Sequence, residues 1–299
     1  MDFPKAELVR PKAATILVNA MVLMGVLLLM EGMIAALLHW PPPMKPLLRV
    51  LSSYYTEHDR RIVQALPDCA QYDGVVAYVL RPGSCQFSNY DFETAVDVNS
   101  LGLRDDEASI DRPGVVMLGD SFTMGWGVNQ SDSFPSIYER VCQTKTLNAG
   151  ISSYGTVRSL HLLRRINIEA LTTLFIQYSD NDYDENRLYF ERGNKLQVMS
   201  ESDFHDMQSQ HVSSLTYYPG KHVAQFIPFL ARKSSKRVSR YFMSSGTDTH
   251  EVTLLSQESK AAFYFLNAMA NVFDFPKRTR IVVFRINGRG EFNGSVQHP

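Results

Sequence analysis

The sequence carries almost no net charge and contains no low-complexity run. Its formal net charge is −1 over 299 residues, whereas a protein that binds nucleic acid over its surface needs a clear excess of Lys and Arg. This balance excludes a global nucleic-acid footprint, and we expect no nucleic-acid partner. With 44% hydrophobic residues, the chain has enough apolar material for the core of one large domain with attachments.

Cysteine is also scarce, with 3 in the whole chain. Cys69 and Cys85 flank a short apolar segment, Val75–Leu80, and a disulfide closing that loop stabilises a fold by about 3 kcal/mol. Such a pair suits an oxidising compartment. Cys142 falls in a helical stretch, where we expect it to be a small buried hydrophobic residue.

Charge is absent from a long run near the N-terminus, Ala13–Met30, which continues past Glu31 to Leu38. The run is long enough to span a bilayer. Each Leu, Ile or Val favours insertion by about 0.3–0.6 kcal/mol, so their sum outweighs the single Glu31 near one end. We predict a transmembrane anchor, with a cleaved signal peptide and a buried core helix as the alternatives.

The anchor divides the chain into segments. We expect a cytoplasmic N-terminus over residues 1–12, the anchor over 13–38, and a juxtamembrane linker and covering segment over 39–98. Basic residues are nearly balanced on the two sides of the anchor. The orientation therefore rests on the cysteine pair, which favours a main domain outside the cytoplasm.

From Val115 onward, short apolar runs alternate with helical patterns, which is typical of an α/β fold with a parallel sheet. The predicted strands are Val115–Leu118, Thr146–Ala149, Leu171–Tyr178 and Arg280–Ile286. The predicted helices of this region are Ser133–Gln143, Thr156–Ile166 and Leu255–Phe273. Before it, we expect a helix over Leu47–Leu66 and extended pieces over Tyr72–Leu103.

The turn Gly119-Asp120-Ser121 directly follows the first of these strands. A parallel sheet keeps its ligand crevice at the carboxyl ends of its strands, so a serine at this point can be a nucleophile. Gly, Asp and Ser are also ordinary turn and cap residues, and a capped strand-to-helix turn is the alternative. Polar sequences follow the second and third strands as well, and we expect all three to converge in space.

Taken in order, Gly119-Asp120-Ser121, the block from Asn148 to Gly155, and Asn181-Asp182 resemble the motifs of the SGNH (GDSL-type) hydrolase superfamily. The lead-in Asn99–Arg104 is similar to that of membrane-anchored bacterial members. The resemblance covers about residues 99–286. It implies a flavodoxin-like three-layer α/β/α domain, here over 99–299, in a single-pass protein of a bacterial plasma membrane.

The resemblance also implies roles for individual residues, without a metal or other cofactor. Ser121 is the expected nucleophile, and its own backbone N–H is part of the oxyanion hole. Asn181 is the expected side-chain donor. The family usually has glycine where this chain has Ser153, whose backbone N–H is the other expected donor, with Gly155 as the alternative. The implied substrate is an acylated small molecule, glycan or lipid.

The family's catalytic Asp-x-x-His block is missing from its usual place, since the sequence ends soon after the fourth predicted strand. We therefore expect a C-terminally incomplete sheet. His298, in Ser295–Pro299, is the only sequence candidate for the base in a similar context, and His250 is expected to be an ordinary surface residue. Without a base, a serine nucleophile is not activated. A non-catalytic protein that binds an acylated ligand or a partner is the alternative function.

An insertion over residues 191–253 separates the third strand from the next helix. Long insertions tend to be lids or binding loops. Its basic cluster is either a solvated helix face or a contact to anionic lipid head groups. The cluster consists of Arg232, Lys233, Lys236, Arg237 and Arg240. The acidic run over residues 180–185 lacks the spacing of a calcium loop, so we expect a solvated loop with Asn181 turned inward.

Overall fold

The computed structural model describes residues 13–243 and 250–285, and for residues 13, 180, 181, 234–243 and 250–258 it describes the backbone alone. The chain forms two compact units. Unit 1 consists of Met1–Arg60 with Ser214–Thr247, and unit 2 consists of Arg61–Ser213 with Asp248–Pro299. We describe each unit by itself.

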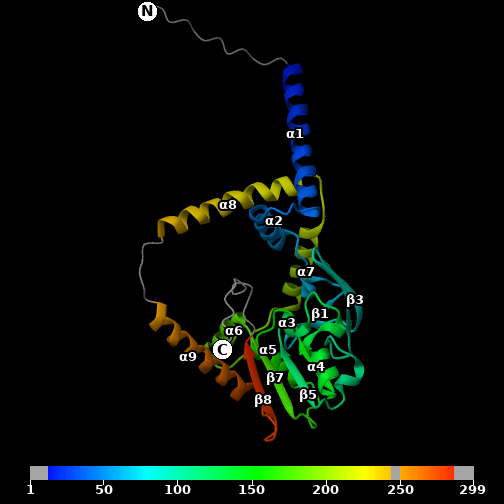
Figure 1. The fold of residues 1–299 in the computed structure, drawn as a ribbon, viewed down its shortest axis with the longest axis vertical. Coiled ribbons are helices and arrows are strands. Elements are labelled where there is room, and N and C mark those ends of the chain that lie inside the picture. The colour runs from blue at the N-terminus through cyan, green and yellow to red at the C-terminus, as the bar shows by residue number, and fades with distance from the viewer. Residues whose placement is uncertain (1–12, 244–249, 286–299) are drawn as a thin grey trace, which may run out of the picture. The chain divides into compact units, whose positions relative to one another are not determined.

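The core of unit 2 is a four-stranded parallel sheet in the order β6-β5-β7-β8 (Figure 1). Its strands are β5 (Val115–Gly119), β6 (Thr146–Gly150), β7 (Thr173–Tyr178) and β8 (Arg280–Arg285). β5 and β6 are buried throughout because helices cover both of their faces, as is usual for parallel strands. The predicted α/β fold with a parallel sheet is confirmed.

Helices lie on both faces of this sheet. They are α3 (Ser121–Met124), α4 (Phe134–Cys142), α5 (Thr156–Leu163), α6 (Asp180–Glu191) and α9 (His250–Val272). Tyr138 of α4 packs on Phe175 at 5.2 Å, and Phe265 of α9 packs on Tyr178 at 5.8 Å between ring centroids. Residues three apart on a strand point to opposite faces, so α4 and α9 cover opposite sides and the domain has three layers.

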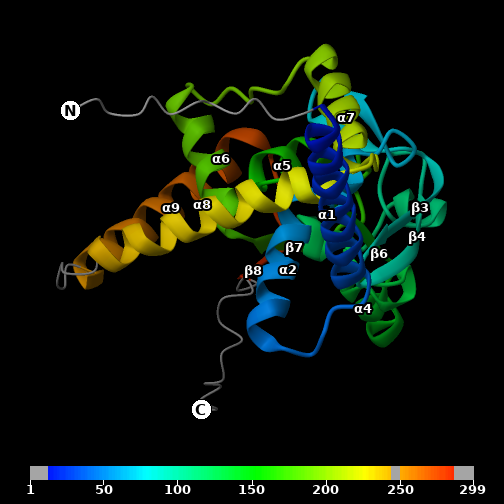
Figure 2. The same cartoon turned by 90° about the horizontal axis from the view of Figure 1, so that it is seen from above.

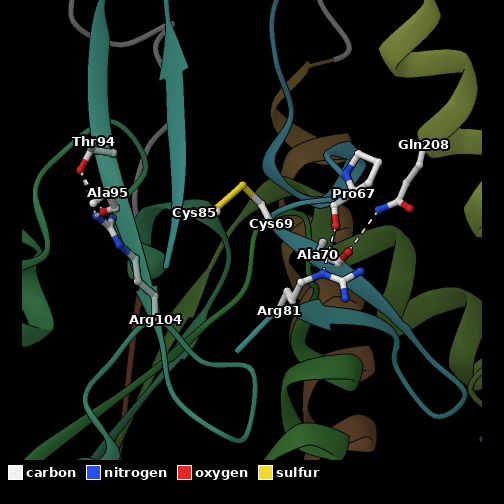
Figure 3. The surroundings of a disulfide bond; sticks show 9 residues. All are labelled: Pro67, Cys69, Ala70, Arg81, Cys85, Thr94, Ala95, Arg104 and Gln208. Carbon is white, nitrogen blue, oxygen red and sulfur yellow. Dashed lines mark hydrogen bonds between the residues drawn. A yellow bond between two sulfur atoms is a disulfide. The ribbon is translucent and has the colours of Figure 1, made fainter. Parts of the chain in front are cut away.

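Two hairpins precede the sheet in unit 2. They are built from β1 (Ala70–Asp73) with β2 (Ala77–Leu80), and β3 (Gly83–Asn89) with β4 (Phe92–Val98). A disulfide joins Cys69, directly before β1, to Cys85 on β3, with the Cα atoms 5.4 Å apart (Figure 3). The predicted pairing of these cysteines is confirmed. The remaining elements are the helix α7 (Glu201–Leu215) and three 3-10 turns, Val63–Ala65, Glu107–Ile110 and Gln130–Asp132.

Unit 1 is helical where the structure describes it, with α1 (Ala13–His39), α2 (Lys45–His58) and α8 (Lys221–Met243). Within α1, residues Ala14–His39 contain an 18-residue window with a mean hydropathy of 2.4, and this window is mostly exposed. This helix is long and apolar enough to cross a membrane. Both views show α8 running crosswise to α1 from the end of α1 that precedes α2 (Figures 1 and 2).

Three local expectations need correction. The helix predicted over Leu47–Leu66 ends at His58. The N–H of Arg61 donates to Asn89 Oδ1 at 2.8 Å and so is not available for a helical bond. Cys142 is exposed rather than buried, because it is the last residue of α4. The acidic run over 180–185 is the start of α6 rather than a solvated loop.

Candidate functional site

The turn after β5 is held closely against the end of β7. The N–H of Asp120 donates to Gln177 Oε1 at 3.1 Å, and Thr123 Oγ1 donates to the same oxygen at 3.1 Å. A Cβ atom on Gly119 would lie 2.2 Å from Thr123 Oγ1 and 2.5 Å from Gln177 Oε1. Only glycine at this position therefore lets the Gln177 side chain reach the turn.

Asp120 links the turn to β7 a second time. Its carboxylate accepts the N–H of Phe122 at 2.9 Å, which caps α3, and also the hydroxyl of Ser179 at 2.7 Å. Ser179 in turn accepts a hydrogen bond from Gln177 Nε2. The side chain of Asp120 is buried, with 7% of the residue exposed. One buried network thus fixes the backbone on both sides of Ser121.

Ser121 is the first residue of α3 and is half-buried. The first N–H groups of a helix have no partner within the helix, so the N–H of Ser121 is not engaged by α3. Among the described residues, no side chain or backbone group forms a hydrogen bond with Ser121 Oγ. This hydroxyl is therefore held in place by its backbone and is not paired with a described histidine or carboxylate.

The loop after β6 packs against the other side of the Ser121 turn. The N–H of Ile151 donates to the carbonyl of Gly119 at 3.1 Å. A Cβ atom on Gly150 would lie 2.4 Å from the backbone nitrogen of Met124 and 2.6 Å from Thr123 Cβ. The loop and α3 approach each other closely because Gly150 has no side chain, so the first two polar blocks of the sequence lie together.

Ser153 lies in this loop with a left-handed backbone, at φ 63°. Its side-chain oxygen accepts from Gln64 Nε2 at 2.9 Å, and its carbonyl accepts from Arg158 Nη2 at 2.6 Å. No described residue accepts the N–H of Ser153. A non-glycine residue in this conformation is strained by about 1–2 kcal/mol, and these contacts hold it there.

Gly155 differs from Ser153 in the state of its N–H. That N–H donates to Glu185 Oε2 at 3.3 Å, and a Cβ atom on Gly155 would lie 2.8 Å from the Glu185 carboxylate. The Glu185 carboxylate also accepts a hydrogen bond from Arg158 Nε at 2.7 Å. Gly155 is therefore a residue of close approach to Glu185, and its N–H is already used.

The third polar block begins α6, and Asn181 is its second residue. The side chain of Asn181 lies outside what the structure describes, as do the side chain of His250 and the whole of His298. The neighbouring Asp182 is buried and accepts from Thr156 Oγ1 and from the N–H of Ser179, each at 2.6 Å. Burial raises the pKa of Asp182 to about 7.

Two residues that support the turn were missed by the sequence reasoning. Arg104 is fully buried and donates to the carbonyls of Gly125, at 2.6 Å, and Val128, at 2.9 Å, where α3 ends (Figure 3 shows its position). Gln177 is the other. Arg104 ends the lead-in motif, which was the available signal for it, whereas nothing in the pattern of β7 distinguishes Gln177.

A cavity of about 300 Å³ lies in unit 2, lined among others by Arg158, Glu185, Arg192 and Lys195. Within the described ranges, no group of three or more His, Cys, Asp or Glu side chains could hold a metal ion.

Comparisons with known proteins leave the family open. A scan against protein-family models found no match. A search of the curated proteins also found no match. A search of solved structures returned a chain described as a mutant of the esterase AlinE4, 15% identical, with 55% of this chain and 98% of that chain covered and a TM-score of 0.22. A likeness at this TM-score carries no argument, so the fold rests on the strand register and the site on its own geometry.

Proposed function

We propose that this chain is a membrane-anchored serine esterase or acyltransferase of the SGNH type, which acts outside the cytoplasm on an acylated glycan or lipid. One observation carries the proposal. Ser121 follows a buried parallel strand at the carboxyl edge of the sheet, half-exposed, between the β6 loop and a buried network that joins Asp120 to β7. Open α/β sheets bind their ligands at this edge.

In the proposed reaction, Ser121 Oγ attacks the acyl carbonyl of the substrate. The N–H groups of Ser121 and Ser153 and the side-chain amide of Asn181 donate to the oxyanion, and each such donor typically contributes about 10²–10³ in rate. Ser153 is preferred to Gly155 because the Gly155 N–H is engaged by Glu185. The proton of Ser121 passes to a base, for which His298 is the sequence candidate, and from the base to the alcohol that leaves as the ester bond breaks. Water or a second alcohol then takes the acyl group from Ser121.

A fluorophosphonate probe tests the nucleophile directly. We expect the full-length protein in detergent to be labelled and the Ser121→Ala variant to be unlabelled. Ser131→Ala is the matched control, because Ser131 is an exposed serine on the 3-10 turn Gln130–Asp132, and this variant is expected to label like the wild type. A folded wild-type protein that stays unlabelled contradicts the enzyme proposal.

A non-catalytic SGNH-like protein is the second candidate function. It is favoured by one observation, that Ser121 Oγ has no hydrogen bond to a base among the described residues. In that case the crevice binds an acylated ligand without turnover. The two candidates differ in fluorophosphonate labelling. Only for the enzyme is a substrate ester expected to compete with the probe, and only for the enzyme is His298→Ala expected to reduce the labelling.

The proposed location rests on α1 and on the disulfide between Cys69 and Cys85, which suits an oxidising compartment. Cys142 offers an internal reporter because it is free and exposed. A membrane-impermeant maleimide is expected to label Cys142 in intact spheroplasts, and Cys69 and Cys85 only after reduction. Labelling of Cys142 that requires cell lysis contradicts the proposed orientation.

A further inference from the structure

In unit 1, α8 begins at a carboxylate of α1. Glu31 has 4% of its surface exposed and accepts the N–H groups of His222 at 3.2 Å and Val223 at 2.9 Å. From Ala14, where the apolar stretch begins, Glu31 is about 26 Å along the helix, against about 30 Å for the hydrocarbon core of a bilayer. The first turn of α8 is therefore fixed to α1 near the end of that core, about 4 Å short of it.

The inner face of α8 is occupied by α2. Tyr54 of α2 is fully buried, and its ring packs on Phe226 at 5.2 Å and on Phe229 at 5.5 Å between centroids. Its hydroxyl donates to Gln225 Oε1 at 3.1 Å. These contacts hold α8 crosswise to α1, as both views show (Figures 1 and 2). A helix crosswise to a membrane span runs along the membrane surface.

The outer face of α8 is apolar and exposed. Ala224, Ile227, Pro228 and Ala231 follow the spacing i, i+3, i+4, i+7 of one helix face, and all four are exposed. Ile227 is 52% exposed, and Leu230 beside this stripe is 39% exposed. We call these four residues with Leu230 the α8 stripe.

The charge of α8 has a single sign. Its sequence contains no acidic residue, and the stripe is followed by Arg232 and Lys233, both exposed. Arg232 binds Glu57 at 2.6 Å, and Lys233 Nζ lies 5.1 Å from the centre of the Phe229 ring. Lys236, Arg237 and Arg240 follow in the sequence of the same helix. An apolar stripe combined with basic residues is typical of helices that lie in a membrane interface.

We propose that the α8 stripe docks on the surface of a bilayer that contains anionic lipids, so that unit 1 is an anchor with both a spanning and an interfacial helix. The inference rests on α1 as a membrane span. A second copy of the chain is a poorer occupant, because its α8 contains no acidic residue that could pair with the basic residues beside the stripe. Anionic head groups complement those residues, at about fivefold in binding for each Lys or Arg near the surface.

The test uses the full-length chain, one copy per lipid nanodisc, with Cys142→Ser and with a polarity-sensitive fluorophore on Ile227→Cys. The discs contain phosphatidylcholine alone or with phosphatidylglycerol. In anionic discs we expect the label to be quenched by nitroxides on the lipid chains and protected from aqueous iodide. Arg232→Gln with Lys233→Gln is expected to shift the ratio of docked to undocked helix by about 25-fold towards the undocked state.

Four outcomes would overturn the inference. Equal access of iodide in both kinds of disc means that the stripe faces water, and protection from both quenchers means that protein covers it. Equal quenching by lipid in both kinds of disc removes the role of charge. A chain that does not remain in discs at all contradicts α1 as a span, and the inference fails with it. The labelling of Ser121 by a fluorophosphonate is independent of all four.

Discussion

The helices α3 and α8 both begin at a carboxylate, and they differ in where that carboxylate comes from. Asp120 immediately precedes α3 and accepts the N–H of Phe122. Glu31 lies 191 residues before His222 and accepts two N–H groups at the start of α8. The local cap fixes the position of a few atoms around Ser121. The remote cap determines where a whole helix lies.

The same contrast exists at the two ends of α3. Its N-terminal end is capped locally by Asp120, whereas its C-terminal end is bound by Arg104, whose Nη1 reaches the carbonyl of Gly125 from 21 residues away. Arg104 also reaches the carbonyls of Ala95 and Val128. A short helix has little stability of its own. The geometry of Ser121 therefore depends on both a local and a distant residue.

The largest expected effect is that of removing the distant residue. Arg104→Met removes the guanidinium from the carbonyls of Gly125, Ala95 and Val128, which keep only the longer bonds from Val128 N–H and Thr94 Oγ1. A hydrogen bond from a charged donor contributes about 1.5–3 kcal/mol. We expect unit 2 to lose about 4–5 kcal/mol. In a Trp40→Phe background, the fluorescence of Trp126 reports unfolding of this unit in detergent and urea.

Arg104→Lys is the matched control, since it keeps the charge but not the planar set of donors. It is expected to lose less stability than Arg104→Met. Equal unfolding midpoints for Arg104→Met and the wild type would mean that the carbonyls at the end of α3 do not depend on the distant residue.

The next effect concerns pH and a third capping carboxylate, Asp182. Burial raises its pKa to about 7 from 3.8, so the folded state holds the proton more tightly than the unfolded state. Its contribution to stability is complete below pH 4 and is lost as the pH rises from about 4 to about 7. The full pKa shift corresponds to a change in the free energy of unfolding on the order of 4 kcal/mol.

Asp182→Asn isolates this contribution. The difference in unfolding free energy between the wild type and Asp182→Asn is expected to change with pH between about 4 and 7 and to be constant above that range. Burial raises the pKa of Asp105 to about 6 and lowers the pKa of His161. Both groups titrate in the wild type and in the variant, so their contributions cancel in the difference. A difference that does not vary with pH contradicts a buried, protonated Asp182.

Removal of the remote cap in unit 1 comes third. Glu31→Leu leaves the N–H groups of His222 and Val223 without an acceptor, which costs about 3 kcal/mol. We expect amide hydrogen exchange at the start of α8 to accelerate by about 100-fold in the full-length protein in nanodiscs. Glu31→Gln keeps one acceptor oxygen, so its exchange rate at the start of α8 is expected to lie between those of the wild type and Glu31→Leu. Unchanged exchange in Glu31→Leu would show that the aromatic contacts of Tyr54 hold α8 alone.

The sequence predicts those parts of the fold that depend on neighbouring residues. Apolar runs locate the four strands, and the Gly119-Asp120-Ser121 turn indicates a helix cap at the right position. The prediction that Cys142 is buried is wrong because the helical pattern gives its element but not that the end of α4 is exposed. The loop predicted for the acidic run is wrong because two of its carboxylates have partners far away in the sequence. Asp182 accepts hydrogen bonds from Thr156 and Ser179, and Glu185 binds Arg158.

Contacts made across long sequence separations have no local signal. Glu31 in an apolar run predicts only a cost of insertion, and the N–H groups that donate to it at the start of α8 become known from the fold alone. Gln177 continues the pattern of a buried strand, and only the register of β7 beside β5 brings it to Asp120. The position of Ser121 directly after β5 is therefore predictable from its motif, while the residues that hold this turn in place mostly are not.

The smallest expected change in stability separates the two roles of the local cap. Asp120→Ala removes the acceptor of Phe122 N–H and of the Ser179 hydroxyl, and the loss of an N-cap costs about 1 kcal/mol. Because a displacement of about 1 Å at a reacting atom can reduce a rate by about 100-fold, we expect fluorophosphonate labelling of Ser121 to fall far more than stability does. Asp120→Asn, an equally good cap, is expected to keep the unfolding midpoint of Trp126 and most of the labelling. If Asp120→Ala labels at the wild-type rate, then the local cap contributes to the stability of α3 but does not position Ser121.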